Sequence, residues 1–199
     1  MYICKQKKEK SYDKDKLYRY LDFGRRCPRH ECRYPCRWDS VPIMNVKIEE
    51  LKSETFDFYR KKGIKSNRLN DDVLTDSNEI LLNNLKLTDG EYLKRAAILL
   101  FHPDPERYIT NAYIKIGYFE SDSDLVFQDE IHGNLIEQVE KTMDLLFTKY
   151  IKAIISYDGI YRMETFEYPK EAIREALLNA VAHKDYAGVT PIQISVYKD

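Results

Sequence analysis

Residues 174–186 read Arg-Glu-Ala-Leu-Leu-Asn-Ala-Val-Ala-His-Lys-Asp-Tyr, and an apolar run, Pro191 to Tyr197, follows almost at once. The first segment predicts a helix and the second a strand. Residues four apart lie on one face of a helix, so Glu175 and Asn179 direct a carboxylate and an amide towards one point. Oxygen donors of this kind suit a hydrated Mg²⁺ ion and a chain of phosphates.

Two long helices are expected in the second half of the chain. The last one begins at Pro169, a residue suited to the first helical position, and runs to His183. The longer one extends from Ile131 to about Ala153, because an apolar stripe with a helical period runs along it. The stripe, which we expect to lie in the core, consists of Ile131, Leu135, Val139, Met143, Leu146 and Tyr150.

The first half predicts shorter helices. The first runs from Ile48 to Lys62 and is stopped by Gly63, and the second is capped by Asp76 or Ser77 and runs to Leu85. A third lies near Glu91 to Arg95, after a turn at Asp89-Gly90. A turn or short helix runs from Asp104 to Glu106. Four segments predict strands before the last one. These are Ala96 to Phe101, Ala112 to Phe119, Leu125 to Gln128 and Thr165 to Tyr168. The alternation of helices and short strands along the chain predicts a fold of the mixed α+β class.

Composition excludes several classes of protein. The 199 residues carry a formal net charge of −1, so net charge gives no argument for nucleic acid or membrane partners. No apolar run approaches the roughly 20 residues that span a bilayer. The N-terminal Met-Tyr-Ile-Cys leads into a charged run without a secretory pattern. We therefore expect a cytoplasmic protein with no membrane partner, whose cysteines are thiols.

A basic segment with three cysteines lies near the N-terminus. Thiolates and imidazoles are zinc ligands, and Cys27, His30, Cys32 and Cys36 cluster here. The spacing contains no Cys-x2-Cys pair, so reduced cysteines in a turn-rich segment are the alternative. The same segment carries five arginines that can contact a phosphate backbone, although a solvated loop explains them equally well. They are Arg25, Arg26, Arg29, Arg33 and Arg37.

The run from Glu175 to Tyr186, with the strand after it, resembles the opening of the ATPase-like domain in bacterial and archaeal transcriptional regulators. These proteins are often labelled RecG-related ATP-dependent DNA helicases. The domain is of the Bergerat type, shared with histidine kinases, gyrase B and MutL, and its Glu-x-x-x-Asn helix is the N box. The resemblance covers about residues 37–199. Upstream it includes Arg37 to Pro42, Arg95 to Phe101, Asp104 to Arg107 and Gly133 to Gln138.

The resemblance implies three parts. Residues 1–40 are the remnant of a Schlafen-related, AlbA-like DNA-binding domain, which Leu17 to Tyr20 and Gly24 to Arg26 resemble. Residues 41–160 are a central linker module of helices and strands. Residues 161–199 are the first helix and strand of a Bergerat-type α/β sandwich. The resemblance implies that the intact protein binds DNA. It leaves open whether the protein forms a homo-oligomer.

The resemblance also implies roles for single residues in a site for ATP and Mg²⁺. Asn179 matches the asparagine that ligates Mg²⁺ between the nucleotide phosphates. Glu175 matches the catalytic position that orients the attacking water as a general base. His183 and Lys184 match basic positions near the phosphates. The alternative is that a Glu-x-x-x-Asn pair occurs by chance and that polar residues simply close a helix.

The chain departs from the family pattern in its glycines. A Bergerat domain needs an Asp-x-Gly-x-Gly box for the adenine, but the seven glycines here form no Gly-x-Gly, and no Walker motif is present. We therefore expect a piece of the regulator that binds ATP poorly or not at all, does not hydrolyse it, and leaves the last strand as an unpaired edge. The alternatives are a DNA-binding or scaffold module whose N-box helix only packs, and an inert gene fragment.

Overall fold

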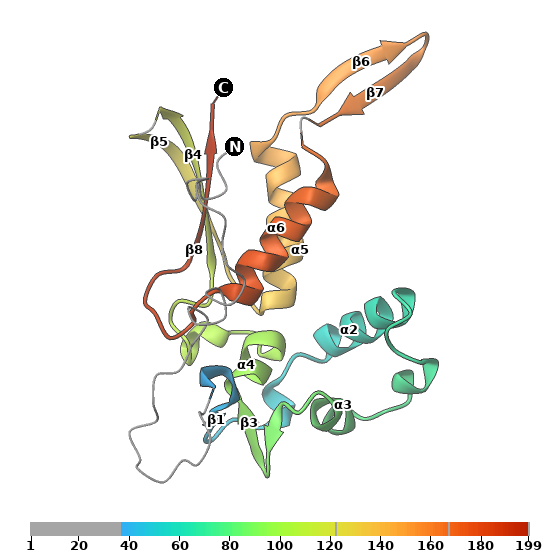
Figure 1. The fold of residues 1–199 in the computed structure, drawn as a ribbon, viewed down its shortest axis with the longest axis vertical. Helices are drawn as coiled ribbons and strands as arrows, with labels where there is room; N and C mark the ends of the chain where they lie inside the picture. Colours follow the sequence, from blue (N-terminus) through green and yellow to red (C-terminus); the bar gives the residue numbers. More distant parts are fainter. Residues whose placement is uncertain (1–36, 122, 167, 199) are drawn as a thin grey trace, which may run out of the picture. The chain divides into compact units, whose positions relative to one another are not determined.

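The computed structural model describes residues 37–121, 123–166 and 168–198 and has a mixed α+β fold (Figure 1). The fold class predicted from the sequence is confirmed. The chain divides into two compact units between Tyr108 and Ile109. We call residues 37–108 the first unit and residues 109–198 the second unit, and describe each by itself. No helix in the described part of the chain is long and apolar enough to cross a membrane.

The first unit combines three short helices with a small antiparallel sheet. Its elements are β1 (Pro42–Ile43), α2 (Ser53–Lys65), α3 (Asn78–Asn84), β2 (Thr88–Asp89), β3 (Tyr92–Lys94) and α4 (Arg95–Phe101). The strand order is β1-β3-β2. The predicted cap of α3 is confirmed, because the Ser77 hydroxyl accepts a hydrogen bond from the Ile80 amide at 3.3 Å. The core contains Phe56 and Phe101, whose stacked ring centroids are 4.1 Å apart.

Three predictions in the first unit are wrong. The segment predicted as a strand from Ala96 to Phe101 is helix α4, which is buried on several sides and therefore lacks the polar face that marks most helices. The segment predicted as a helix near Glu91 is strand β3, because the turn at Gly90, with φ of 60°, folds it back onto β2. Gly63 does not stop α2, which continues to Lys65.

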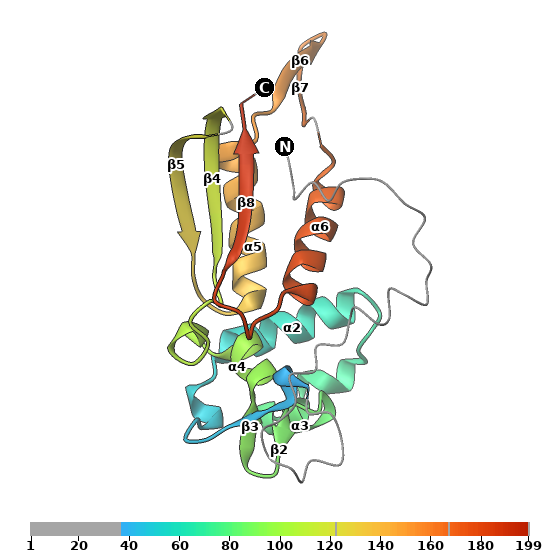
Figure 2. The same cartoon turned by 60° about the vertical axis from the view of Figure 1, so that its left-hand side comes forward.

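The second unit has a three-stranded sheet with two helices on one side (Figures 1 and 2). Its elements are β4 (Ile114–Ser121), β5 (Asp124–Ile131), α5 (Leu135–Leu145), β6 (Ile154–Asp158), β7 (Tyr161–Thr165), α6 (Lys170–His183) and β8 (Ile192–Tyr197), and α5 continues as a π-helical turn, Leu146–Tyr150. The strand order is β5-β4-β8, with β4 antiparallel to β5 and parallel to β8. Among the described strands of this sheet, β8 lies at an edge and pairs with β4.

The core of the second unit forms between the sheet and the two helices. Ile114 and Ile116 of β4 are fully buried. Ile109 and Ala112, before β4, are buried as well. The other buried apolar side chains come from β5, α5 and its π-helical turn, α6 and β8. They are Ile131, Leu135, Val139, Met143, Leu146, Tyr150, Ile173, Leu177, Val181 and Val196. The apolar stripe predicted from Ile131 to Tyr150 is therefore confirmed as core.

The limits of the long helices differ from the prediction. Ile131 belongs to β5, where it pairs with Ile114, and α5 begins only after Asn134. The Asn134 side-chain oxygen accepts from the Glu137 amide at 2.9 Å and so caps the helix. Pro169 is the residue before α6 rather than its first residue. The strand predicted from Thr165 to Tyr168 is wrong, since β7 ends at Thr165.

Candidate functional site

Helix α6 separates its apolar and polar residues onto different faces. Ile173, Leu177 and Val181 are buried, with exposed fractions of 3%, 4% and 9%. The row of Glu175, Asn179 and His183 follows the same four-residue spacing and is exposed along its whole length. We call these three residues the α6 polar row. Their side chains are therefore accessible to a ligand instead of being used in the core.

One side-chain contact joins α6 to α5, and another closes the C-terminal end of α6. Arg174 donates to the carboxylate of Glu140 on α5, with Nη2 2.5 Å and Nη1 3.5 Å from its two oxygens. After the helix, the Tyr186 hydroxyl donates to the carbonyl oxygen of Val181 at 3.1 Å. A tyrosine hydroxyl is protonated at neutral pH and can donate this bond, and burial raises the pKa of Tyr186 further. Because Arg174 joins α6 to α5 and the apolar face of α6 is buried, the α6 polar row keeps a defined direction.

Lys184, the other basic residue predicted at this site, has a different environment. It follows the last residue of α6 and is half-buried, with Nζ 4.6 Å from the centroid of the Tyr186 ring. Burial lowers the pKa of Lys184. Its ammonium group is thus engaged by an aromatic face, whereas His183 extends into solvent.

The predicted basic segment is described only at its end. Arg25, Arg26, Arg29 and Arg33 lie outside the described residues, as do Cys27, His30, Cys32 and Cys36. Arg37 is exposed, and its Nε lies 3.6 Å from the Asp39 carboxylate. Trp38 packs under Arg95, whose guanidinium carbon is 4.6 Å from the indole ring centroid. Among the described residues, no group of three or more His, Cys, Asp or Glu side chains is arranged to hold a metal ion.

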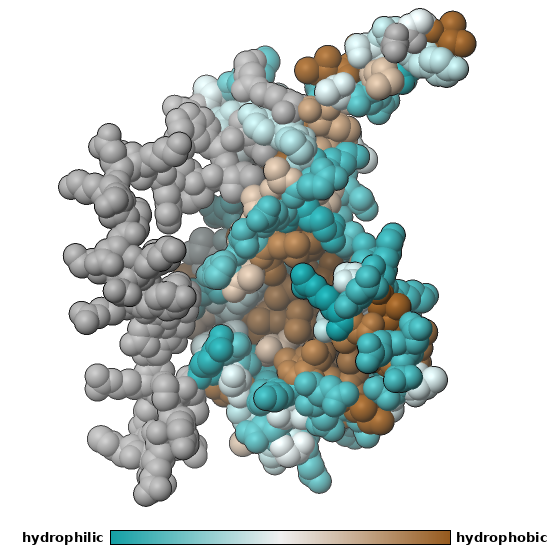
Figure 3. Space-filling model, turned by 45° about the vertical axis from the view of Figure 1, so that its right-hand side comes forward, coloured by the Kyte–Doolittle hydropathy of each residue, from teal (hydrophilic) through white to brown (hydrophobic). Residues whose placement is uncertain are grey.

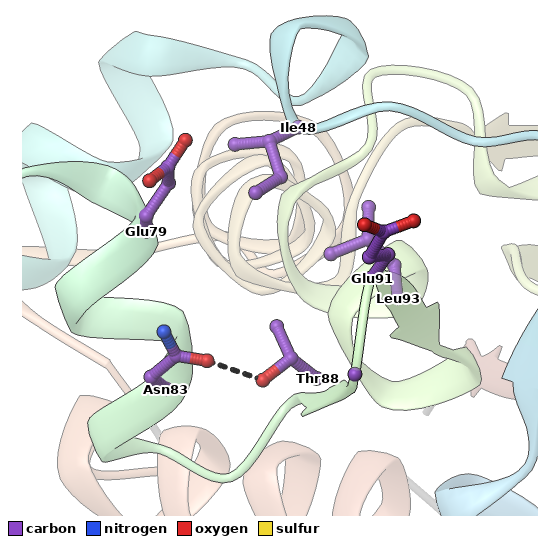
Figure 4. Close-up of a pocket in the computed structure, with 7 residues that line it drawn as sticks. Ile48, Glu79, Asn83, Thr88, Glu91 and Leu93 are labelled. Carbon is purple, nitrogen blue, oxygen red and sulfur yellow. Dashed lines mark hydrogen bonds between the residues drawn. The ribbon is translucent and has the colours of Figure 1, made fainter.

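The first unit contains a pocket of about 310 Å³ that the sequence did not indicate (Figure 4). Its lining comes from α3, from strands β2 and β3 with the turn between them, and from the 3-10 turn Ile48–Glu50. The other lining residues are Glu79, Asn83, Thr88, Gly90, Glu91 and Leu93. The Thr88 hydroxyl donates to the Asn83 side-chain oxygen at 2.5 Å. No periodic pattern could have found this pocket, because its residues come from three separate segments.

Comparisons with known proteins provide information on the fold of this chain alone. No protein-family model matches the chain, and no curated protein matches its sequence. The chain is similar to the crystal structure of the DIP2311 protein from Corynebacterium diphtheriae, with a TM-score of 0.58 and 19% sequence identity. The match covers 94% of this chain and 34% of that one. The chain therefore spans about a third of the length of that protein and shares its fold over that part.

Proposed function

We propose that this chain is part of an ATP-binding transcriptional regulator of the RecG-related type, in which helix α6 supplies residues for Mg²⁺ and the nucleotide phosphates. The observation that carries the proposal is the α6 polar row. Glu175, Asn179 and His183 face solvent on a helix whose opposite face is buried. A surface helix normally has an exposed polar face, so it is the N-box resemblance that relates these three positions to a nucleotide site.

The chemistry of the row suits this role. The amide oxygen of Asn179 is a hard donor of the kind that Mg²⁺ accepts, and Glu175 places a carboxylate one turn before it. The row ends at the C-terminal end of α6, which is the negative end of the helix dipole. Phosphates bound there need a cation and hydrogen-bond donors, which Mg²⁺ and a ring N–H of His183 would supply.

The proposal concerns a partial site. The chain has no Gly-x-Gly turn to approach an adenine or a phosphate chain closely, so we expect weak nucleotide binding and no hydrolysis by this chain alone. For the longer protein we propose DNA as a partner, on the strength of the arginines between Arg25 and Arg37, and a cytoplasmic location.

An NMR titration of the ¹⁵N-labelled chain with Mg·ATP tests the proposal. We expect dissociation constants in the millimolar range, about −4 kcal/mol, with shifts concentrated at Asn179 and His183. Asn179→Ala should remove those shifts. Asn84→Ala, the same change at an exposed site on α3, is the control and should leave them unchanged. Micromolar binding, or shifts that avoid α6, would contradict the proposal.

A further inference from the structure

Strands β6 and β7 form a hairpin that pairs with no other described strand. Its loop is Gly159-Ile160, and φ of 60° at Gly159 fits a type II′ turn. Six large apolar side chains on it are exposed, and Figure 3 shows apolar surface at both its ends. They are Ile154 (63%), Ile155 (50%), Tyr157 (72%), Ile160 (89%), Tyr161 (70%) and Met163 (52%).

This exposure is unfavourable for a hairpin on its own. A two-stranded sheet is marginally stable in water, and each strand presents one row of unpaired backbone groups. Proteins usually protect such an edge with proline, charged side chains or a covering segment. Strand β7 contains no proline, and its two charged residues, Arg162 and Glu164, have opposite signs and pair with each other. Its edge is therefore suited to receive another strand.

The register of the hairpin determines which backbone groups of β7 face outward. Asp158 pairs with Tyr161 across the two-residue loop, and the next pairs are Tyr157 with Arg162 and Ser156 with Met163. In such a hairpin the pair beside the loop exchanges both hydrogen bonds, and the pairs then alternate. The N–H and C=O groups of Arg162 and Glu164 therefore point away from β6.

The charges on β7 match the same pattern. Arg162 and Glu164 lie on one face of the strand, with Nη2 2.7 Å from Oε1, and both are about half exposed. If two β7 strands pair antiparallel about Met163, Arg162 lies opposite the partner's Glu164, and Glu164 lies opposite the partner's Arg162. These are also the residues whose backbone groups point outward. Charge and hydrogen bonding thus select one register.

We propose that the β6–β7 hairpin is a dimerisation arm that pairs its β7 edge with the β7 edge of a second copy of this chain. The result is a four-stranded antiparallel sheet with Met163 on the two-fold axis. On one face of that sheet, Ile154, Tyr161 and Met163 of both copies lie together. Their apolar side chains then shield one another from water. A second copy fits better than another protein because the charge pattern of β7 is complementary to itself.

Charge reversal tests the register in the full chain. Sedimentation velocity should show a concentration-dependent dimer. Arg162→Glu places like charges opposite each other twice in the dimer, so we expect the dissociation constant to rise about tenfold or more. The double variant R162E/E164R restores two opposite-charge pairs and should dimerise like the wild type. Lys198→Glu, with the same change in charge at a residue outside the hairpin, is the matched control.

Three results of this experiment would overturn the proposal. They are a wild-type chain that stays monomeric up to about 200 μM, an Arg162→Glu variant that dimerises as well as the Lys198→Glu control, and a double variant that does not recover. Far-UV circular dichroism of each variant establishes that a loss of dimer is not a loss of folding.

Disulfide cross-linking tests the position of the axis. In a chain whose four native cysteines are replaced by serine, Met163→Cys places two thiols opposite each other in a non-hydrogen-bonded pair, with Cα atoms about 4.5 Å apart. Tyr157→Cys, on β6, would hold its thiols about three strand spacings apart, roughly 14 Å. Mild oxidation should cross-link the first variant and not the second. Equal cross-linking of both, or none of either, would overturn the proposal.

Discussion

Arg174 of α6 forms a two-pronged contact with Glu140 of α5, with its two guanidinium nitrogens 2.5 and 3.5 Å from the two carboxylate oxygens. Arg174 directly precedes Glu175, so the contact that joins the helices also sets the direction of the α6 polar row. The planar guanidinium group matches a carboxylate in this geometry, which a lysine cannot do. Side chains of both partners are about one-third exposed, which limits the strength of the pair.

A double-mutant cycle measures this contact. We expect Arg174→Ala and Glu140→Ala each to lower the free energy of unfolding by about 0.5–1 kcal/mol, with a coupling energy of similar size. The pair Lys198 and Glu120, which is more than half exposed, is the control and should show weaker coupling. Urea unfolding gives all the values, and a coupling energy near zero for Arg174 and Glu140 would contradict the account.

Truncating an aromatic side chain should destabilise only the first unit. Phe56 is fully buried and stacked on Phe101, so Phe56→Ala should cost about 3–5 kcal/mol. Trp38 is the one tryptophan of the chain and lies in the first unit, so its fluorescence reports unfolding there. Ile116→Ala is the matching change in the core of the second unit. If both variants shift the fluorescence transition equally, the division into two units is wrong.

The stability of the second unit should depend on pH through Asp129. Hydrogen bonds from Lys149 and from Tyr150, at 2.5 and 2.6 Å, lower the pKa of Asp129 from its ordinary 3.8. A lowered pKa gives stability that is present above pH 3.8 and is lost as the pH falls below it. We expect Asp129→Asn to cost about 1–2 kcal/mol at pH 7.

Denaturant titrations at several pH values check this prediction. The difference between the wild type and Asp129→Asn should shrink as the pH falls below 3.8. Asp144→Asn, the same change at an exposed site on α5, is the control. A difference that stays constant down to pH 2 would show that the carboxylate of Asp129 is not stabilised by its partners.

The backbone before helix α5 should require glycine at position 133. Gly133 has φ of 109°, a conformation that side chains rarely adopt, and it precedes the capping residue Asn134. We expect Gly133→Ala to cost about 1–3 kcal/mol of unfolding free energy in thermal or denaturant melts. Gly188→Ala, at a glycine without a positive φ, should cost less. Equal costs would contradict a backbone origin of the effect.

The sequence predicted elements best where one face is buried and the other is polar. The stripe from Leu135 to Tyr150 and the alternation along β4 both follow from that contrast. Helix α4 is short and apolar on most sides, so length and composition do not separate it from a buried strand. The β6–β7 hairpin has a signal in the sequence, the dipeptide Asp158-Gly159 between β-forming residues, and the observed loop lies one residue later, at Gly159-Ile160.

The candidate site could be predicted only in part. The helical period alone places Glu175, Asn179 and His183 on one face, and the structure has them there, exposed. The half-buried position of Lys184 beside Tyr186 could not be predicted, since it depends on how the chain turns after α6. The same holds for the pocket around Glu79, which needs three segments folded together.

Paramagnetic broadening by Mn·ATP tests the role of α6 most directly, because Mn²⁺ replaces Mg²⁺ and broadens the NMR signals of nearby groups. We predict that the side-chain amide of Asn179 and the ring of His183 broaden first, and that Mn²⁺ without nucleotide does not reproduce the pattern. Broadening that begins at Glu79 and Glu91 in the first unit, or that spares α6 throughout the titration, would contradict the proposal that α6 holds the metal and the phosphates.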